Sequence, residues 1–527
     1  MLPMKRRRRF RGDIDLGGNM KHLAELVENL KSVLVCELPE RELNGAVSRL
    51  IYDTRAEFEE NSAFVCISGA SFDGHDFAAE AARKGAKYIF SEKEIGDIEG
   101  AVVIRVSDTR KALSLLSAAW FDHPAEKLTT IGLTGTKGKS TTCYMIRNIL
   151  EASGRSCGII GTIGIVIKDK TYETHNTTPE SYSIQEYMRK MVDAGCDTLI
   201  MEVSSQGLKQ HRTYGINFDY AVFTNLSKDH IGGAEHKDFE EYRYCKSLLF
   251  KQCKTAIVNT DDANTAYMLE GSDAKRVGFG MGSNLKEGEN VRTKVLDDFC
   301  GEILKATELR LFTENGVMGI EFDYEGLLKG TARLSIPGRF NVMNALCAIA
   351  VSSHFTKDTA LISESLKATH VRGRLEPVKI SDKCTMLIDY AHNAMALESV
   401  LKTLREYKPK RLVCLFGCGG NRSKDRRYEM GEVSSNLSDL TVVTSDNPRY
   451  EKPEDIINDI LIGVKRGDGY YITIPDRREA IKYVIDNALE GDCILLTGKG
   501  NEDYQEIEGV RYHMDEREIV ADILKRG

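Results

Sequence analysis

A glycine-rich segment with lysine and hydroxyl side chains could bind the phosphates of a nucleotide. It follows an apolar run at 129–133, precedes a helical pattern at 139–152, and comprises Gly135, Thr136, Lys137, Gly138, Lys139, Ser140 and Thr141. Glycines let backbone N–H groups turn toward phosphate oxygens, and the start of a helix adds positive potential. Lys139 would then reach the β and γ phosphates, and the Ser140 hydroxyl would ligate Mg²⁺. A turn that only caps a helix is the alternative, but the strand–loop–helix context favours a nucleotide site.

Two carboxylates follow neighbouring apolar runs. Glu202 closes the run at 198–203, and Asp229-His230 comes shortly after the run at 220–224. Because the carboxyl ends of parallel strands share one edge of a sheet, these groups are expected near the phosphate loop, where carboxylates hold Mg²⁺. His230 by itself is a weak indication, since single histidines more often pack or face solvent.

A lysine lies in a segment with helical periodicity. The segment 242–250 reads as an amphipathic helix, and spacing alone predicts that Lys246 is a charged residue on its exposed face.

The chain divides into blocks in which strands and helices alternate. We expect a basic tail at 1–19 that is disordered and without function, followed by domains at 20–125, 126–370 and 371–527. Strand–helix alternation indicates an α/β fold with parallel sheets and helices on both faces. The expected strands are 63–67, 102–106, 129–133, 198–203, 220–224, 256–259, 385–389, 411–416, 440–444 and 493–497. The expected helices of the first domain are 76–84 and 109–121.

Composition excludes several classes of protein. The 527 residues are 42% hydrophobic and 29% charged, with a net charge of −7, which gives no electrostatic reason to expect nucleic acid or an anionic membrane as partner. The 13 cysteines form no CxxC pair, as is typical of reduced thiols in a cytoplasmic protein. No apolar run approaches the roughly 20 residues of a membrane span.

The central motifs resemble those of one enzyme family. GTKGKST at 135–141, MEVSS followed by GL and HR at 201–212, TNLSKDH at 224–230 and YxxCKSLLF at 242–250 are similar to segments of the Mur ligase and folylpolyglutamate synthase superfamily. The resemblance implies a three-domain, ATP-dependent ligase that joins a carboxylate to an amine through an acyl phosphate. It implies catalytic roles for Lys139, Glu202, His230 and Lys246. It also implies Mg²⁺ held by Ser140, Glu202, His230 and a carbamylated Lys246.

The same resemblance implies a nucleotide-linked substrate, UDP-N-acetylmuramoyl-L-alanyl-D-glutamate. The first block is similar to the family's uridine-binding domain, with the turn at 70–72 facing the uracil. Residues matching the contacts to this substrate are Thr54, Asn176, Thr177, Thr178, Ser204, Gln210 and Arg212. Residues matching further ATP contacts are Asn341, Asn344, Arg374, Asp389 and His392.

A motif in the third block points to the amine. Asp-Asn-Pro-Arg at 446–449 resembles the segment of family members that add meso-diaminopimelate, whose distal carboxylate an arginine binds bidentately. From the residues alone, Arg449 could equally be a turn arginine facing solvent. The matching positions are Arg422, Asp446, Asn447, Pro448, Arg449, Gly498 and Glu502, the last placed for the distal ammonium.

Three segments depart from the family pattern. GKGHE becomes GKGNE at 498–502, DYAHNP becomes DYAHNA at 389–394, and DHLDYHG becomes DHIGGAE at 229–235. A ligase for L-lysine or another amine therefore stays open, as does a protein that binds UDP-muramoyl peptides without turnover. Folylpolyglutamate synthase is disfavoured, because the 446–449 motif and the first block have no purpose there. We expect a cytoplasmic monomer acting only on small molecules.

Overall fold

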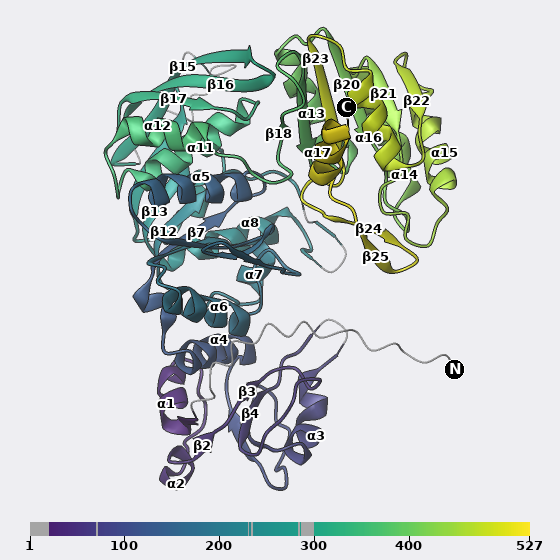
Figure 1. The fold of residues 1–527 in the computed structure, drawn as a ribbon. Helices are drawn as coiled ribbons and strands as arrows, with labels where there is room; N and C mark the ends of the chain where they lie inside the picture. The colour runs from purple at the N-terminus through teal and green to yellow at the C-terminus, as the bar shows by residue number, and fades with distance from the viewer. Residues whose placement is uncertain are drawn as a thin grey trace.

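The computed structural model describes residues 20–69, 72–229, 231–232, 235–282, 285 and 300–526. Three main sheets follow one another along the described chain, the first at the bottom of Figure 1, the second from the middle to the upper left and the third at the upper right. The α/β class with parallel sheets is confirmed.

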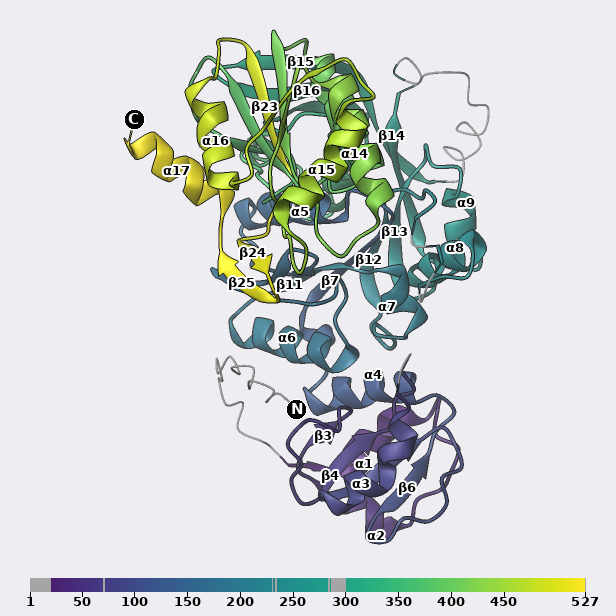
Figure 2. The same cartoon turned by 90° about the vertical axis from the view of Figure 1, so that its right-hand side faces the viewer.

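The first sheet has four parallel strands in the order β3-β4-β5-β6. Helix α4 covers it and packs against α6 (Ser181–Asp193) of the next part, which Figures 1 and 2 both show. Asp108 caps α4 by accepting hydrogen bonds from the N–H groups of Arg110 and Lys111, both at 3.0 Å. The elements here are β1 (Lys21–His22), α1 (Leu23–Val27), α2 (Glu40–Leu43), β2 (Ala46–Val47), β3 (Leu50–Ile51), β4 (Ser62–Val65), α3 (Ala78–Arg83), β5 (Ala86–Ser91), β6 (Val102–Arg105) and α4 (Thr109–Trp120).

The second sheet has eleven strands in the order β10-β9-β8-β11-β7-β12-β13-β14-β15-β16-β17. The run from β8 to β15 is parallel, while β9, β10, β16 and β17 pair antiparallel at the two ends. Its strands are β7 (Thr129–Thr134), β8 (Cys157–Gly161), β9 (Gly164–Ile167), β10 (Lys170–Tyr172), β11 (Thr198–Glu202), β12 (Phe218–Phe223), β13 (Cys253–Asn259), β14 (Lys275–Met281), β15 (Glu302–Glu314), β16 (Val317–Gly326) and β17 (Gly330–Leu334).

Helices cover both faces of this sheet, as the strand–helix alternation predicts. Ile131 and Leu133 of β7 pack with α5 and α11 on one face, whereas Leu199 and Met201 of β11 pack with α6 on the other. The helices are α5 (Lys139–Ala152), α6 (Ser181–Asp193), α7 (Ser205–Lys209), α8 (Phe239–Ser247), α9 (Thr265–Met268), α11 (Phe340–Ser352) and α12 (Thr359–Lys367).

The third sheet has the order β18-β19-β23-β20-β21-β22, parallel except for β18. A separate hairpin, β24–β25, lies below it in Figures 1 and 2. The elements are β18 (Glu376–Val378), β19 (Thr385–Asp389), α13 (Ala394–Glu406), β20 (Arg411–Phe416), α14 (Lys424–Leu437), β21 (Leu440–Val443), α15 (Pro453–Val464), β22 (Tyr470–Thr473), α16 (Arg477–Asp486), β23 (Asp492–Thr497), β24 (Tyr504–Ile507), β25 (Val510–His513) and α17 (Glu516–Arg526).

Predicted and observed elements agree best where an apolar run is bounded by turns. The helix at 139–152 and the strands at 385–389 and 411–416 are confirmed with the same bounds. The predicted helix at 76–84 divides instead into a 3-10 turn at Gly74–Phe77 and α3. The hairpin of β15 and β16 was not predicted, because its exposed faces carry charges that obscure a strand pattern.

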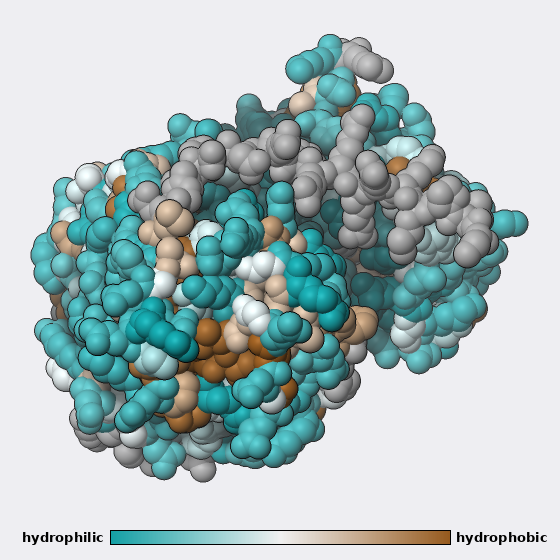
Figure 3. Space-filling model, turned by 90° about the horizontal axis from the view of Figure 1, so that it is seen from below, coloured by the Kyte–Doolittle hydropathy of each residue, from teal (hydrophilic) through white to brown (hydrophobic). Residues whose placement is uncertain are grey.

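The surface and the thiols agree with the composition. Figure 3 shows a mostly hydrophilic face with a limited apolar area, and no helix in the described part of the chain has the length and apolarity to span a membrane. All thirteen cysteines are free, and eleven of them are buried.

Candidate functional site

The phosphate loop joins β7 to the first turn of α5. Gly135 and Gly138 have φ values of +150° and +87°, which favour glycine. A Cβ at Gly138 would lie 2.2 Å from Oδ1 of Asn344, and one at Gly135 would lie 2.0 Å from Oγ1 of Thr224. Both positions therefore require glycine, and the uncapped N–H groups that start α5 are available for an anion.

The end of β12 fixes the shape of this loop. The Asn225 side chain accepts from the N–H of Lys137 at 2.9 Å and donates to its carbonyl at 3.0 Å. Thr224 Oγ1 donates to the same carbonyl at 2.8 Å. Neither residue was predicted as a site residue, although both lie in the TNLSKDH segment.

Glu202 lies at the carboxyl end of β11, beside the loop. Its Oε1 accepts from Ser140 Oγ at 2.8 Å and from the N–H of Thr162 at 3.0 Å, and its Oε2 accepts from Thr162 Oγ1 at 3.0 Å. The side chain is almost fully buried, with 2% exposed. Thr162 was missed because it follows β8 in a turn that carries no motif.

Two lysines converge on one carbonyl oxygen of the loop. Lys139 Nζ and Lys246 Nζ each donate to the Gly135 carbonyl at 2.8 Å. Lys246 lies 4.7 Å from the centre of the Tyr242 ring and is only 2% exposed, so the spacing-based prediction of an exposed lysine was wrong. Its helix, α8, turns this side toward the phosphate loop rather than toward solvent.

Burial lowers the pKa of both lysines. Removal from water lowers the pKa of Lys246 well below its usual value, and the neighbouring Lys139 charge lowers it further. Removal from water also lowers the pKa of Lys139, against the attraction of Glu202. The two amines share one neutral acceptor, so the positive charge that either of them carries attracts an anion to this site.

One predicted metal ligand, His230, remains to be placed. Asp229 forms an ion pair with Lys137 at 3.5 Å, and His230 lies outside the described residues. Within the described ranges, no group of three or more His, Cys, Asp or Glu side chains is arranged to hold a metal ion.

The residues predicted to hold the nucleotide-linked dipeptide form a network next to Glu202. Thr178 Oγ1 donates to the Glu202 carbonyl at 2.9 Å, and Arg212 Nη1 donates to the Thr178 carbonyl at 2.7 Å. Three more residues of the predicted set lie in this part of the chain. The Ser204 hydroxyl lies 3.1 Å from the Thr178 hydroxyl, the Thr177 hydroxyl lies 3.0 Å from the Thr162 hydroxyl, and Gln210 is half-buried.

Two members of that predicted set stand apart from the network. Asn176 is exposed, and its carbonyl accepts from Thr174. Thr54 lies in the first sheet's part of the chain, where its carbonyl accepts from Lys84 at 3.1 Å. No hydrogen bond in the described part of the chain joins Thr54 to the rest of the set.

The predicted amine-binding residues lie together beyond β21 and β23. Asn447 donates to Glu502 Oε2 at 2.8 Å, and the fully buried Lys499 donates to both Asn447 Oδ1 at 2.9 Å and Glu502 Oε2 at 3.0 Å. A Cβ at Gly498 would lie 2.9 Å from Asp446 Oδ2, which places that glycine against the aspartate. Lys499 was not predicted as a site residue, although it lies inside the GKGNE segment.

Arg449 lies at the edge of this group with a strained backbone. Its φ is +52°, its Nη1 donates to the Gly420 carbonyl at 2.8 Å, and its Nε lies 3.3 Å from Glu506. Pro448 is buried beside Gly420, whose Cβ would lie 1.9 Å from the Pro448 carbonyl. Arg422 is exposed on the loop that follows β20.

The predicted ATP residues outside the loop fall into two places. Asn344 and Asn341 of α11 are buried and joined by a 3.0 Å hydrogen bond, with Asn344 against Gly138. Asp389 accepts from the N–H groups of Leu375 and Ala391 at 2.8 Å each, and burial raises the pKa of its carboxyl.

Arg374 and His392 accompany Asp389 in the third sheet's part of the chain. Arg374 stacks 5.0 Å from the Tyr390 ring, and the exposed His392 lies 4.8 Å from the same ring. Among the described residues, no hydrogen bond or ion pair joins these three to the phosphate loop.

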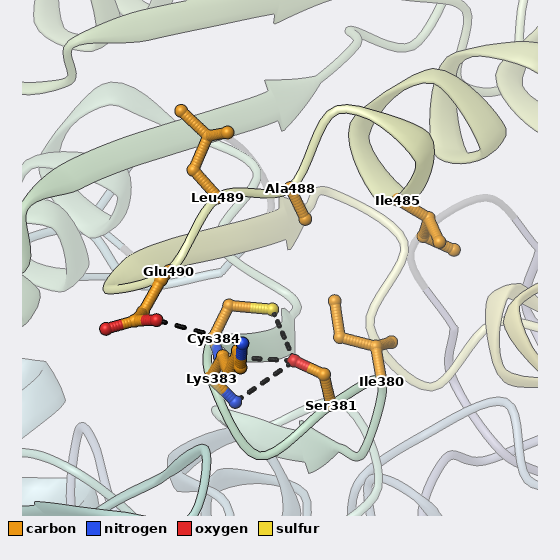
Figure 4. Close-up of a pocket in the computed structure, with 8 residues that line it drawn as sticks. All are labelled: Ile380, Ser381, Lys383, Cys384, Ile485, Ala488, Leu489 and Glu490. Atoms are coloured by element: carbon orange, nitrogen blue, oxygen red, sulfur yellow. Dashed lines mark hydrogen bonds and ion pairs between the residues drawn. The ribbon is translucent and has the colours of Figure 1, made fainter.

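One cavity lies away from all of these residues. It has a volume of about 270 Å³ and is lined by Ile380, Cys384, Ile485 and neighbours, with the Ser381 hydroxyl facing Cys384 and Lys383 (Figure 4). These residues precede β19 and β23, whereas the predicted site residues follow the strands. The cavity is therefore at the opposite edge of the sheet from the candidate site.

The fold and the loop define an α/β protein of the P-loop type. The description "Mur ligase middle domain" matches residues 133–352, "Mur ligase, glutamate ligase domain" matches 373–500, and "Mur ligase family, catalytic domain" matches 56–121. The chain belongs to the Mur ligase family, and it is an ATP-dependent, ADP-forming peptide ligase.

Relatives cover nearly the whole chain. A UDP-N-acetylmuramoyl-L-alanyl-D-glutamate--2,6-diaminopimelate ligase of Clostridium acetobutylicum is 39% identical over 508 residues, covering 95% of this chain and 99% of the relative. The ligase of that name from Clostridium perfringens is 38% identical, covering 91% and 95%. A solved structure with the same protein name is 26% identical, with a TM-score of 0.69, covering 96% of this chain and 99% of that one.

Proposed function

We propose that this chain adds meso-diaminopimelate to the D-glutamate γ-carboxylate of UDP-N-acetylmuramoyl-L-alanyl-D-glutamate, in the cytoplasm, through an acyl phosphate. The observation that carries the proposal is the convergence of the phosphate loop, Glu202 and two lysines at the carboxyl ends of β7 and β11. The names of its relatives supply the substrates. The free cysteines support the cytoplasmic location.

The chain's own groups suit the first step. A carboxylate is a poor electrophile, so one of its oxygens must first accept the γ-phosphoryl group of ATP, with ADP leaving. The amine then attacks the carbonyl carbon of the acyl phosphate and displaces phosphate. Lys139 and the N–H groups at the start of α5 would attract the γ phosphate of ATP, and Arg212 and Ser204 would orient the acceptor carboxylate beside it. Asn344, against Gly138, would lie on the nucleotide side of the loop.

The donor set around Glu202 fits Mg²⁺. Ser140 and Glu202 present oxygen atoms 2.8 Å apart beside the phosphate loop, and hard cations prefer such ligands. Bound Mg²⁺ would neutralise phosphate charge during transfer. Ser140 and Glu202 would hold it, with His230 as a further ligand.

Lys246 fits that set only after modification. An ammonium repels a metal ion, whereas a carbamate formed on its amine supplies anionic oxygens. The lowered pKa of Lys246 favours the neutral amine that reacts with carbon dioxide. We therefore propose that Lys246 is carbamylated in the active enzyme.

The loops after β21 and β23 would bind the amine. Arg449, with Arg422, would hold the distal carboxylate, and Glu502 the distal ammonium, of a zwitterionic diamino acid. Asp446, Asn447 and Gly498 would line the same pocket.

The test measures ATP-dependent phosphate release with UDP-N-acetylmuramoyl-L-alanyl-D-glutamate and either meso-diaminopimelate, L-lysine or no amine. Turnover with diaminopimelate alone is expected. Arg449→Met should raise the KM for diaminopimelate about 10- to 100-fold, the loss of one charge-assisted contact. The exposed Arg466, paired with Glu432, provides the matched control Arg466→Met, which should leave KM unchanged.

Each other result has a definite meaning. Preference for L-lysine would support the assignment as a ligase and refute meso-diaminopimelate as its amine substrate. Absence of phosphate release with every amine would favour a protein that binds UDP-muramoyl peptides without turnover.

A further inference from the structure

A buried arginine spans the ends of the two strands that carry the amine-binding loops. Arg477 begins α16, and only 2% of it is exposed. Its Nη1 donates to the Ser445 carbonyl at 3.1 Å, and its Nη2 donates to the Thr497 carbonyl at 3.0 Å. Ser445 directly precedes Asp446, and Thr497 directly precedes Gly498. One planar guanidinium is therefore bonded to the base of both loops and fixes the distance between them.

The third nitrogen of the same guanidinium is held by the C-terminal helix. Arg477 Nε donates to Glu516 Oε1 at 2.9 Å, and Glu516 is fully buried at the start of α17. Figure 2 shows α17 beside α16. Arg517, the next residue, donates to the Gly500 carbonyl at 2.9 Å, so the first turn of α17 also reaches the GKGNE segment.

A second bridge joins the loops closer to their tips. Lys499 and Glu502 of one loop both bond to Asn447 of the other, at 2.9 and 2.8 Å. Arg477 is the bridge at the base of the loops, and these three residues form the bridge near the pocket. The inter-loop spacing is therefore set at two levels.

We propose that Arg477, held by Glu516, is a positioning residue for the amine substrate, and this rests on the proposed function of the two loops. A zwitterionic diamino acid must contact Arg449 on one loop and Glu502 on the other at the same time. Its affinity therefore depends on the distance that Arg477 sets. ATP and the nucleotide-linked substrate are assigned to other elements, so their binding should depend on this distance less than that of the diamino acid does.

The test must separate positioning from simple support of the core. Replacing Arg477 alone would leave the Glu516 carboxylate buried without its partner, which strongly destabilises a protein for reasons unrelated to the pocket. The double variant Arg477→Met/Glu516→Leu removes both charges at similar volume, a change that buried ion pairs often tolerate. The neighbouring Arg478 is half exposed and 3.6 Å from Asp522, so Arg478→Met is the matched control.

Steady-state kinetics of the full chain give the first readout. The double variant should melt within a few degrees of the wild type, while its KM for meso-diaminopimelate rises about 10- to 100-fold, as displacements near 1 Å cause. The KM values for ATP and for the nucleotide-linked substrate should change less than about twofold. The Arg478→Met control should match the wild type.

Amide hydrogen exchange of residues 445–449 and 497–502 gives a second readout that needs no turnover. Faster exchange in these two segments of the double variant, and not elsewhere, supports the proposal. This holds even if the wild type does not accept diaminopimelate, because that result would refute only the proposed amine substrate. Unchanged exchange in both segments overturns it. An equal rise of all three KM values, or a wild-type KM for the diamino acid, also overturns it.

Discussion

Replacing Lys246 by methionine should stabilise the ligand-free protein while abolishing its activity. The Lys246 ammonium is 2% exposed and donates to the Gly135 carbonyl, which also accepts from Lys139. No carboxylate in the described part of the chain forms an ion pair with it. Methionine fills a similar volume and leaves the Gly135 carbonyl with its second donor, so the substitution removes a buried charge without leaving an unsatisfied acceptor.

The magnitude follows from two opposing terms. Keeping a charge of this kind out of water costs several kcal/mol, and the lost hydrogen bond to a charged donor is worth about 1.5–3 kcal/mol. The net gain on substitution is about 1–3 kcal/mol, equal to a rise in melting temperature of roughly 2–4 °C for each kcal/mol in the unfolding of a domain of about 150–250 residues.

The gain in stability from Lys246→Met should decrease as pH rises. The folded-state pKa of Lys246 is lowered well below its usual value of 10.5, so between those two values the unfolded chain binds more protons than the folded one. Wild-type stability therefore rises with pH in that window, by at most about 1.4 kcal/mol per pH unit. The advantage of Lys246→Met should shrink accordingly as pH rises.

Thermal unfolding in bicarbonate-free buffer at several pH values checks this, with Lys251→Met as the control on an exposed lysine a short distance along the same segment. Acetate or another small carboxylate should restore part of the activity of Lys246→Ala, because it can occupy the place of the carbamate. A lower melting temperature for Lys246→Met at neutral pH would refute the reasoning on the buried charge. A fully active Lys246→Ala would refute the role in catalysis.

Two further predictions concern a glycine and a glutamate. Gly138→Ala should weaken ATP binding at least tenfold in a calorimetric titration, whereas Gly154→Ala, also at positive φ but with open space around it, should cost only about 1 kcal/mol of stability and no affinity. Equal affinities in the two variants would count against the Asn344 contact as the cause. The hydrogen bond from Arg427 lowers the pKa of Glu451 to about 2, so the stability it contributes is present above 4.5 and is lost as pH falls toward 2. The difference in unfolding free energy between wild type and Glu451→Gln should therefore narrow over that range; a constant difference in acid titrations followed by circular dichroism would contradict it.

The phosphate loop could be predicted from the sequence because its constraints are local. Gly135 and Gly138 are required by backbone conformation and by contacts within a few residues of a strand and a helix. The helix at 139–152 was predicted with its observed bounds for the same reason. The residues that shape the loop from outside, Thr224 and Asn225, depend on which strand lies next to β7, and this order is not local information.

Spacing failed for Lys246 because periodicity identifies the polar face of a helix but not what covers that face. The polar side of α8 at Lys246 lies against the phosphate loop, so its lysine is buried. A pattern of apolar residues can only report the face that packs against the core. Only the resemblance to a known family distinguished this lysine from a surface one.

The same limit explains the residues that were missed in the third sheet. Lys499 and Arg477 are charged side chains in segments that read as loop and helix start, and both are buried in the structure. Arg477 is neutralised by Glu516, which is distant in sequence, and Lys499 is neutralised by Glu502, three residues further along the chain. Burial of a charge is expensive unless it is paired, which is why each of these two basic side chains needs its carboxylate partner. In this chain three buried basic side chains, Lys246, Lys499 and Arg477, lie beside segments proposed to bind substrate, and the sequence pattern alone does not distinguish them from basic residues that face solvent.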